Sequence, residues 1–156
     1  MKTVFYILIG IAIVLFLVIA IILGPYVVRV QHFEASPANG WHADFYLYVS
    51  PESQRIAREG GQVTLLVQPN NSGTNSNDPE VHRRDAWMTG FERYRIANEL
   101  GVVLLVPAFI RPGEDAHIYT HALDRDSIII ERVDIKRIDL QLLAMIDHAR
   151  ITLADS

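Results

Sequence analysis

Residue types that favour unusual backbone conformations gather where an apolar run stops. The run at residues 63–68 is followed closely by Asn70, Asn71, Ser72 and Gly73. These residues adopt left-handed and bridge conformations at little cost, so a loop made of them can point its N–H groups at a developing negative charge. That is the chemistry of an oxyanion hole. The same residue types also make ordinary turns, so an unspecialised strand-to-helix connection is the alternative.

Two histidines four residues apart, His117 and His121, form a second group that could do chemistry. On a helix this spacing puts both imidazoles on one face, as a zinc site requires. However, Pro112 and Gly113 precede them, and "HIYTH" lacks the glutamate that serves as a base in H-E-x-x-H. The stretch is therefore interpreted as a loop, and we expect neither a bound metal nor another cofactor. A metal site at these two histidines is the weaker alternative.

Two apolar strands and a helix between them would position the first loop. Residues 62–68 are apolar on both faces, as in a central strand of a parallel sheet, and residues 102–109 form a second such strand. Between them, Asp78 suits an N-cap, Pro79 the first helical position and Gly101 a left-handed C-cap. A strand, a helix and a strand in this order predict a parallel crossover unit.

Hydrophobic periodicity predicts two further elements. Residues 43–50 alternate between apolar and polar types, which predicts a strand with one buried face. Residues 135–153 carry one clean apolar stripe with helical spacing. On the helix that starts near Asp78, the aromatic side chains are expected to pack against the sheet. They are Trp87, Phe91 and Tyr94.

The remaining histidines are expected to be ordinary surface residues. His82 lies in the first turn of the earlier helix, and His148 lies near the end of the later one. Without a nucleophile beside them, a catalytic role is not expected for either. We therefore expect both side chains to be partly exposed.

The N-terminal region predicts a membrane anchor. Val4 and Leu23 bound twenty residues without a charge, enough for a helix to cross about 30 Å of hydrocarbon. A cleavable signal peptide is the alternative, but its apolar region is usually about 7–15 residues long. We therefore expect a single-pass membrane protein with residues 32–156 outside the cytoplasm. The chain would divide into an anchor and its flank at 1–31, a linker at 32–42 and one domain at 43–156.

Composition excludes several classes of function. The formal net charge is −4 with no block of basic residues, so a nucleic-acid partner is not expected. The chain has no cysteine, which excludes a disulfide framework.

The order of these elements resembles the N-terminal half of an α/β-hydrolase. The segments "LLVQPNNSGT", "GVVLLVPAF", "YTHALDRD" and "RIDLQLLAMIDHA" are similar to the esterase and polyester-depolymerase branch of that superfamily. The resemblance implies that Asn70, Asn71, Ser72 and Gly73 form the oxyanion loop. It also implies an ester substrate for a full-length parent.

The same resemblance places a second group of residues at the mouth of the substrate cleft. This group comprises His117, Tyr119, His121 and Asp124.

The catalytic triad that the resemblance calls for is absent. The 156 residues contain no G-x-S-x-G pentapeptide, and the acid and histidine follow the serine in chain order. We therefore nominate no catalytic residue and expect a chain truncated before the nucleophile, inactive alone. The fold class expected is α/β: an N-terminal transmembrane helix and a partial α/β-hydrolase-type parallel sheet with crossover helices.

The strand predicted at residues 63–68 leads to two alternative expectations for the whole chain. In the family's strand order this strand would pair with the nucleophile strand, so a bare edge and a marginally stable domain are expected. The alternative is a non-catalytic, membrane-tethered binding module on the same scaffold, which covers that edge by self-association.

Overall fold

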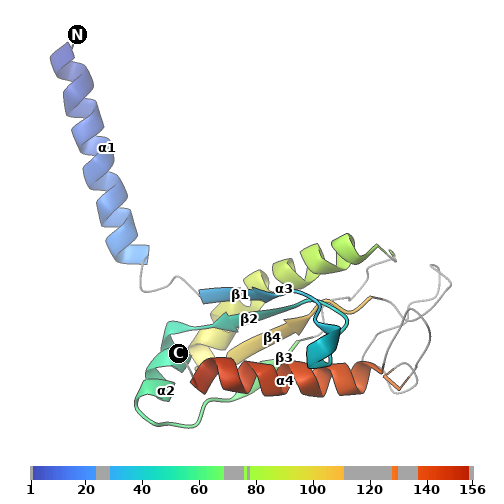
Figure 1. Ribbon diagram of the computed structural model, residues 1–156. Helices are drawn as coiled ribbons and strands as arrows, with labels where there is room; N and C mark the ends of the chain where they lie inside the picture. Colours follow the sequence, from blue (N-terminus) through green and yellow to red (C-terminus); the bar gives the residue numbers. More distant parts are fainter. Residues whose placement is uncertain are drawn as a thin grey trace.

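One mixed sheet between two long helices forms the body of the protein. The computed structural model describes residues 2–23, 29–68, 76, 78–110, 128–129 and 137–154. Within them, α3 (Pro79–Leu100) covers one face of the sheet and α4 (Ile138–Ala154) covers the other (Figure 1). The described sheet has four strands in the order β1-β2-β4-β3. It is mixed, because β2 runs antiparallel to both β1 and β4, which corrects the parallel sheet expected from the sequence. The strands are β1 (Arg29–Phe33), β2 (Phe45–Val49), β3 (Leu65–Val67) and β4 (Val103–Pro107).

The crossover unit forms as its sequence predicts. β3 pairs with β4 in parallel, Leu66 lying opposite Leu104, and α3 connects the two strands. The Asp78 side chain accepts a hydrogen bond from the N–H of Glu80 at 3.0 Å, and Pro79 opens the helix. Gly101 ends it at a φ of 64°, the left-handed conformation that glycine adopts without strain. The predicted bounds of this helix are therefore confirmed.

β1 corrects the predicted linker at 32–42. It pairs antiparallel with β2, from Arg29 opposite Val49 to Phe33 opposite Phe45. A short 3-10 helix, η2 (Pro37–Asn39), follows and leads to the buried Trp41. β1 is an edge strand of the described sheet with mixed polar and apolar residues, so it carries no hydrophobic pattern that would reveal it in the sequence.

β2 is buried on both faces, not on one as its alternation predicts. Phe45 and Leu47 pack in the core on the α4 side, whereas Tyr46 and Tyr48 pack in the core on the α3 side. The tyrosines mimic a solvent face in the sequence because they are amphipathic. The buried hydroxyl of Tyr48 donates a hydrogen bond to the carbonyl oxygen of Trp87 at 2.6 Å, which satisfies its polar end.

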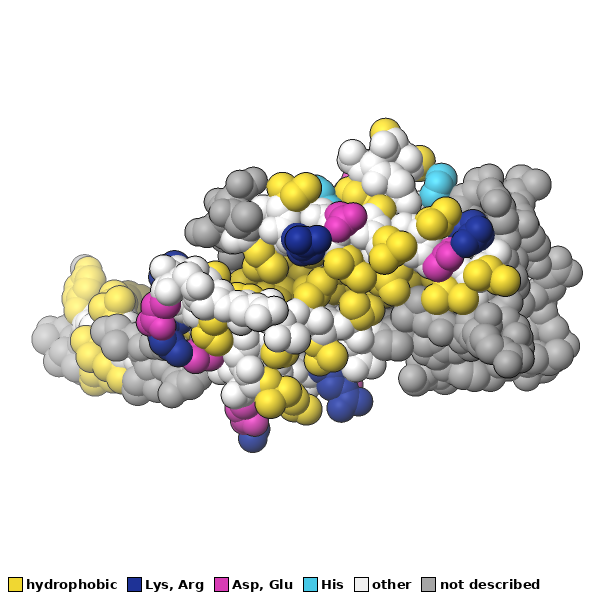
Figure 2. Space-filling model, turned by 90° about the horizontal axis from the view of Figure 1, so that it is seen from below, with side chains coloured by type: hydrophobic (Ala, Val, Ile, Leu, Met, Phe, Trp, Pro, Cys, Tyr) yellow, Lys and Arg dark blue, Asp and Glu magenta, His cyan; other side chains and the backbone are white. Residues whose placement is uncertain are grey.

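β3 is an edge strand in the described sheet, not the central strand that its apolar residues predict. It pairs with β4 only, and the Leu66 side chain is 42% exposed. Figure 2, seen from the α4 side, shows hydrophobic side chains gathered across the middle of that face. An apolar strand at an edge leaves unpaired backbone groups and exposed carbon beside each other.

α3 packs on the sheet mainly through small residues, so the prediction is wrong for Trp87 and Phe91, whereas Tyr94 packs against the core on this side as predicted. Small residues face β2 and β4, whereas Trp87 and Phe91 are 43% and 53% exposed on the outer side. Gly90 explains this orientation, because a Cβ placed there would lie 2.0 Å from the ring of Tyr48. Tyr48 fills the space between helix and sheet, so only the small-residue face of α3 can approach.

The later helix keeps the predicted apolar stripe. Ile138, Met145 and Ala149 are buried against the sheet, one face of α4, as expected. Its predicted first residues, from 135, lie outside the described residues. The connection between β2 and β3 contains the two-turn helix α2 (Pro51–Arg58), which is capped by Ser50.

α1 (Lys2–Leu23) stands apart from the sheet in Figure 1, and its described side chains are exposed. Among the residues that the structure describes, no helix combines the length and the apolar character needed to cross a membrane. The predicted transmembrane anchor and the single-pass membrane localisation are corrected accordingly.

Candidate functional site

The two loops predicted from the sequence follow strands whose carboxyl ends lie at the same end of the sheet. β3 and β4 are parallel, so residues 69–75 and 111–127 both begin at the carboxyl end of a strand. In open α/β sheets, ligands bind at the carboxyl ends of the strands. The oxyanion-loop candidates Asn70, Asn71, Ser72 and Gly73 lie outside the described residues. The cleft candidates lie outside them too: His117, Tyr119, His121 and Asp124.

The end of the first loop is fastened to α3 by a buried histidine. His82 is fully buried, which corrects the expectation of a partly exposed side chain. Its Nε2 lies 2.7 Å from the carbonyl oxygen of Ser76, and the Ser76 hydroxyl accepts from the N–H of Asp78 at 3.0 Å. His82 precedes Ala86 and Gly90 at four-residue steps, and that small-residue stripe is the signal that could have revealed its burial.

The N-terminus of α3 has no spare backbone donors among its first N–H groups. Glu80 donates to the Asp78 side chain, and Val81 and His82 donate to the Asp78 carbonyl oxygen. Pro79 has no N–H at all. The backbone of this helix end therefore offers no free N–H group to an anion.

A pocket of about 300 Å³ opens at this end of the molecule, at the small end of the size range for ligand sites. Its walls come from the chain before β2, the start of α3, the residues after β4 and the start of α4. The lining residues are Ala35, His42, Ala43, Asp44, Pro79, Arg83, Ala108, Phe109, Ile110, Ile138 and Gln141.

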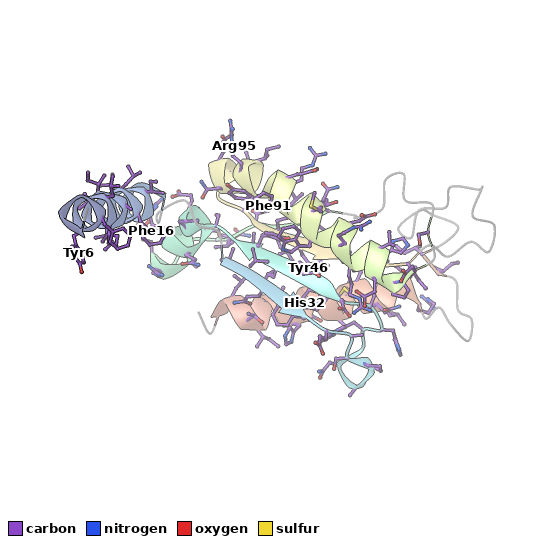
Figure 3. All side chains as sticks on the ribbon, turned by 90° about the horizontal axis from the view of Figure 1, so that it is seen from above. Tyr6, Phe16, His32, Tyr46, Phe91 and Arg95 are labelled. Carbon is purple, nitrogen blue, oxygen red and sulfur yellow. The ribbon has the colours of Figure 1, made fainter. Side chains whose placement is uncertain are left out.

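Asp44 organises the polar side of the pocket. Its carboxylate accepts a hydrogen bond from the N–H of Ala35 at 2.9 Å, and its other oxygen lies 2.9 Å from Nε2 of His32. The guanidinium of Arg83 lies 3.8 Å from the same carboxylate. The His32 ring in turn stacks on Tyr46, with centroids 4.7 Å apart, and both are labelled in Figure 3.

The wall made by α4 is held to the chain before β2 by one buried amide. The Gln141 side chain is 4% exposed, and its Oε1 accepts a hydrogen bond from the N–H of His42 at 2.7 Å. This contact joins residues 99 positions apart in the sequence. The pocket therefore exists only once α4 has packed on the sheet.

The described part of the pocket has the surface to bind a small molecule. Ile110, Ile138 and Phe109 offer an apolar surface for a short aliphatic group, and Arg83 offers N–H donors to a carbonyl or carboxylate oxygen. Among the described lining residues there is no serine, cysteine or lysine. Spacing in the sequence gave no signal for Asp44, Arg83 or Gln141, because each belongs to a different element.

The alternative metal site at His117 and His121 lies outside the described residues, and His148 is partly exposed, as expected. His148 is partly buried beside Phe33, Trp41 and Phe45, with ring centroids 4.9, 5.0 and 6.2 Å away. It therefore packs in an aromatic cluster. Across the residues that the structure describes, no group of three histidine, aspartate or glutamate side chains could hold an ion.

Comparison with known proteins identifies no relative. No protein-family model, no curated protein and no solved structure matches this chain.

Proposed function

We propose that this chain is an α/β-hydrolase-like scaffold that carries the oxyanion-loop half of a serine ester hydrolase and binds a small ester without cleaving it. One observation carries the proposal. The parallel strands β3 and β4 end side by side, just before residues 69–75 and 111–127, and the described residues after β4 line a small pocket together with Arg83.

The positions of α3 and α4 support the resemblance. The two helices cover opposite faces of the sheet. Crossovers are right-handed, so a parallel strand added after α4 would move away from β4 in the direction of β3 and join beyond it. Such a strand would meet the β3 edge, where the resemblance puts the nucleophile strand. The crevice between it and β3 would be a switch point of the sheet, bordered by residues 70–73.

The proposed function does not include ester hydrolysis. Hydrolysis by the family's route requires a serine on a sharp strand-to-helix turn together with a histidine base, and the 156 residues contain no such elbow. The expected activity of the chain is therefore ester binding without acyl-enzyme formation.

Titration of the full chain with methyl butyrate tests this proposal. Nuclear magnetic resonance should show saturable shifts of the Ile110 and Ile138 methyl groups and of the amides at 70–73, with no butyrate released. Arg83→Gln should weaken binding by about tenfold, the loss of one charged hydrogen bond. Arg95→Gln is the control, because Arg95 lies on the same helix but outside the pocket lining.

Each outcome of the titration has a definite meaning. Chemical-shift changes at the pocket methyl groups without changes at the amides of residues 70–73 would show that residues 70–73 do not form an oxyanion loop. Absence of saturable binding at both places would overturn the ester-binding scaffold altogether.

The exposed β3 edge favours a second candidate, a non-catalytic interaction module. Its edge strand exposes Leu66 and backbone groups that can pair with a strand of another chain. Sedimentation of the full chain and of Leu66→Lys separates the two functions. A discrete dimer that the substitution dissolves supports the module, whereas an unchanged distribution excludes this edge as its interface.

A further inference from the structure

The outer side of α3 carries an exposed aromatic surface. We call Trp87, Met88, Phe91 and Tyr94 the aromatic face of α3. The rings of Trp87 and Phe91 stack 5.6 Å apart with an interplanar angle of 13°, and Tyr94 continues the row at 5.7 Å from Phe91. Met88 is 44% exposed beside them. Trp87 and Phe91 are exposed, whereas Tyr94 is partly buried against the core at the margin of this face. Contiguous exposed apolar side chains such as Trp87, Met88 and Phe91 mark interaction sites.

We propose that the aromatic face of α3 binds the same face of a second copy of this chain, with the two helices antiparallel about a twofold axis at Phe91. The interaction goes beyond the proposed ester-binding function, and the aromatic residues at its centre lie outside the pocket. An isologous contact of this type needs a surface that is complementary to itself.

The sequence of α3 meets that requirement. With Phe91 on the axis, Trp87 lies opposite Arg95 of the second copy, and Met88 lies opposite Tyr94. A guanidinium over an indole and a thioether at a phenol ring are both favourable pairs. Figure 3, seen from the α3 side, labels Phe91 and Arg95 on this helix.

Charges at the two ends of the contact are complementary in the same register. Glu99, whose side chain is 64% exposed, lies opposite Arg83 of the second copy and next to its Arg84. Opposite charges therefore meet at both ends, since the twofold axis repeats every contact. The aromatic side chains occupy the centre, as in stable interfaces.

Cysteine cross-linking tests the contact directly, because the natural chain has no cysteine. In the full chain, Phe91→Cys should form a disulfide-linked dimer on mild oxidation, at least about tenfold faster than Ile96→Cys. Ile96 is a matched control: it lies on α3 with 48% exposure, and five residues turn it about 140° away from Phe91. Equal rates for the two variants would overturn the proposal.

A second experiment keeps Phe91 in place. Mixed Met88→Cys and Tyr94→Cys chains should form a linked heterodimer, and adding Arg95→Glu to both should slow that linkage several-fold. α1 also exposes apolar side chains, so only the position of the cross-link, not dimer formation by itself, reports on α3. Linkage that is unaffected by Arg95→Glu would exclude the register, and absence of the heterodimer would exclude the interface.

Discussion

Gly90 and Tyr48 together decide how α3 lies on the sheet. A Cβ at position 90 would sit 2.0 Å from the Tyr48 ring and 2.6 Å from its hydroxyl oxygen. The ring is fully buried, and its hydroxyl is bonded to the Trp87 carbonyl oxygen, so it cannot swing away. Packing of this one pair overrides the intrinsic weakness of glycine inside a helix.

Gly90→Ala should therefore destabilise the protein although alanine favours helices. Overpacking costs about 1–3 kcal/mol, more than the gain of up to about 1 kcal/mol from helix propensity. Urea unfolding followed by fluorescence should show a lower midpoint. Gly10→Ala is the control, because a Cβ at that helical glycine meets nothing within 4 Å. An unchanged midpoint for Gly90→Ala would contradict the packing described here.

The Tyr48 hydroxyl predicts a loss of stability at alkaline pH. Burial raises the pKa of Tyr48 above its ordinary value of 10.0. Above pH about 10 the unfolded state therefore loses this proton while the folded state keeps it, so stability falls as the pH rises. Tyr48→Phe should lose about 1 kcal/mol at pH 8 but decline less between pH 9 and 11. Parallel alkaline declines of the two proteins would contradict this assignment.

Asp78 dominates the start of α3 at the level of the element. It caps the helix through its side chain and its carbonyl oxygen, and it fixes Ser76 at the end of the candidate oxyanion loop. The buried His82 adds a second fastening to the same serine. The position of Ser76 therefore depends on the first turn of the helix.

Asp78→Ala should weaken the start of α3, because it removes the side-chain oxygen that accepts from the N–H of Glu80. Loss of an N-cap costs about 1 kcal/mol, and hydrogen exchange should accelerate at the amides of Glu80 and Val81. Asp78→Ser, which restores a capping oxygen, should recover most of the stability. An equal loss with serine would show that the carboxylate charge, not the cap, is what matters.

At the level of the whole molecule, the β3 edge is the exposed weakness of the described sheet. Leu66 projects from a three-residue edge strand, and Leu65 and Val67 are only partly buried. An apolar edge of this kind pairs readily with other chains.

Leu66→Lys should reduce aggregation of the full chain with little change in stability. A lysine on an edge strand opposes pairing with another chain, and the partly exposed site tolerates a long polar side chain. Light scattering during heating should begin at a higher temperature, and the free energy of unfolding measured in urea should change by less than about 1 kcal/mol. Unchanged scattering would show that aggregation starts elsewhere.

Local sequence by itself determined the elements whose cause is local. The bounds of α3 follow from Asp78, Pro79 and Gly101, and the apolar stripe of α4 follows from spacing alone, because caps and periodicity act within a few residues. The parallel pairing of β3 with β4 also follows from the order of the elements along the chain.

Only the tertiary structure decided which faces these elements present and what they enclose. The volume of the buried Tyr48 ring leaves Trp87 and Phe91 on the outer side of α3. The stretch that forms β1 has no hydrophobic pattern and becomes a strand only by pairing with β2. The pocket brings Asp44, Arg83 and Gln141 together from separate elements. Such outcomes depend on the volume and position of partners far along the chain, which no local pattern records.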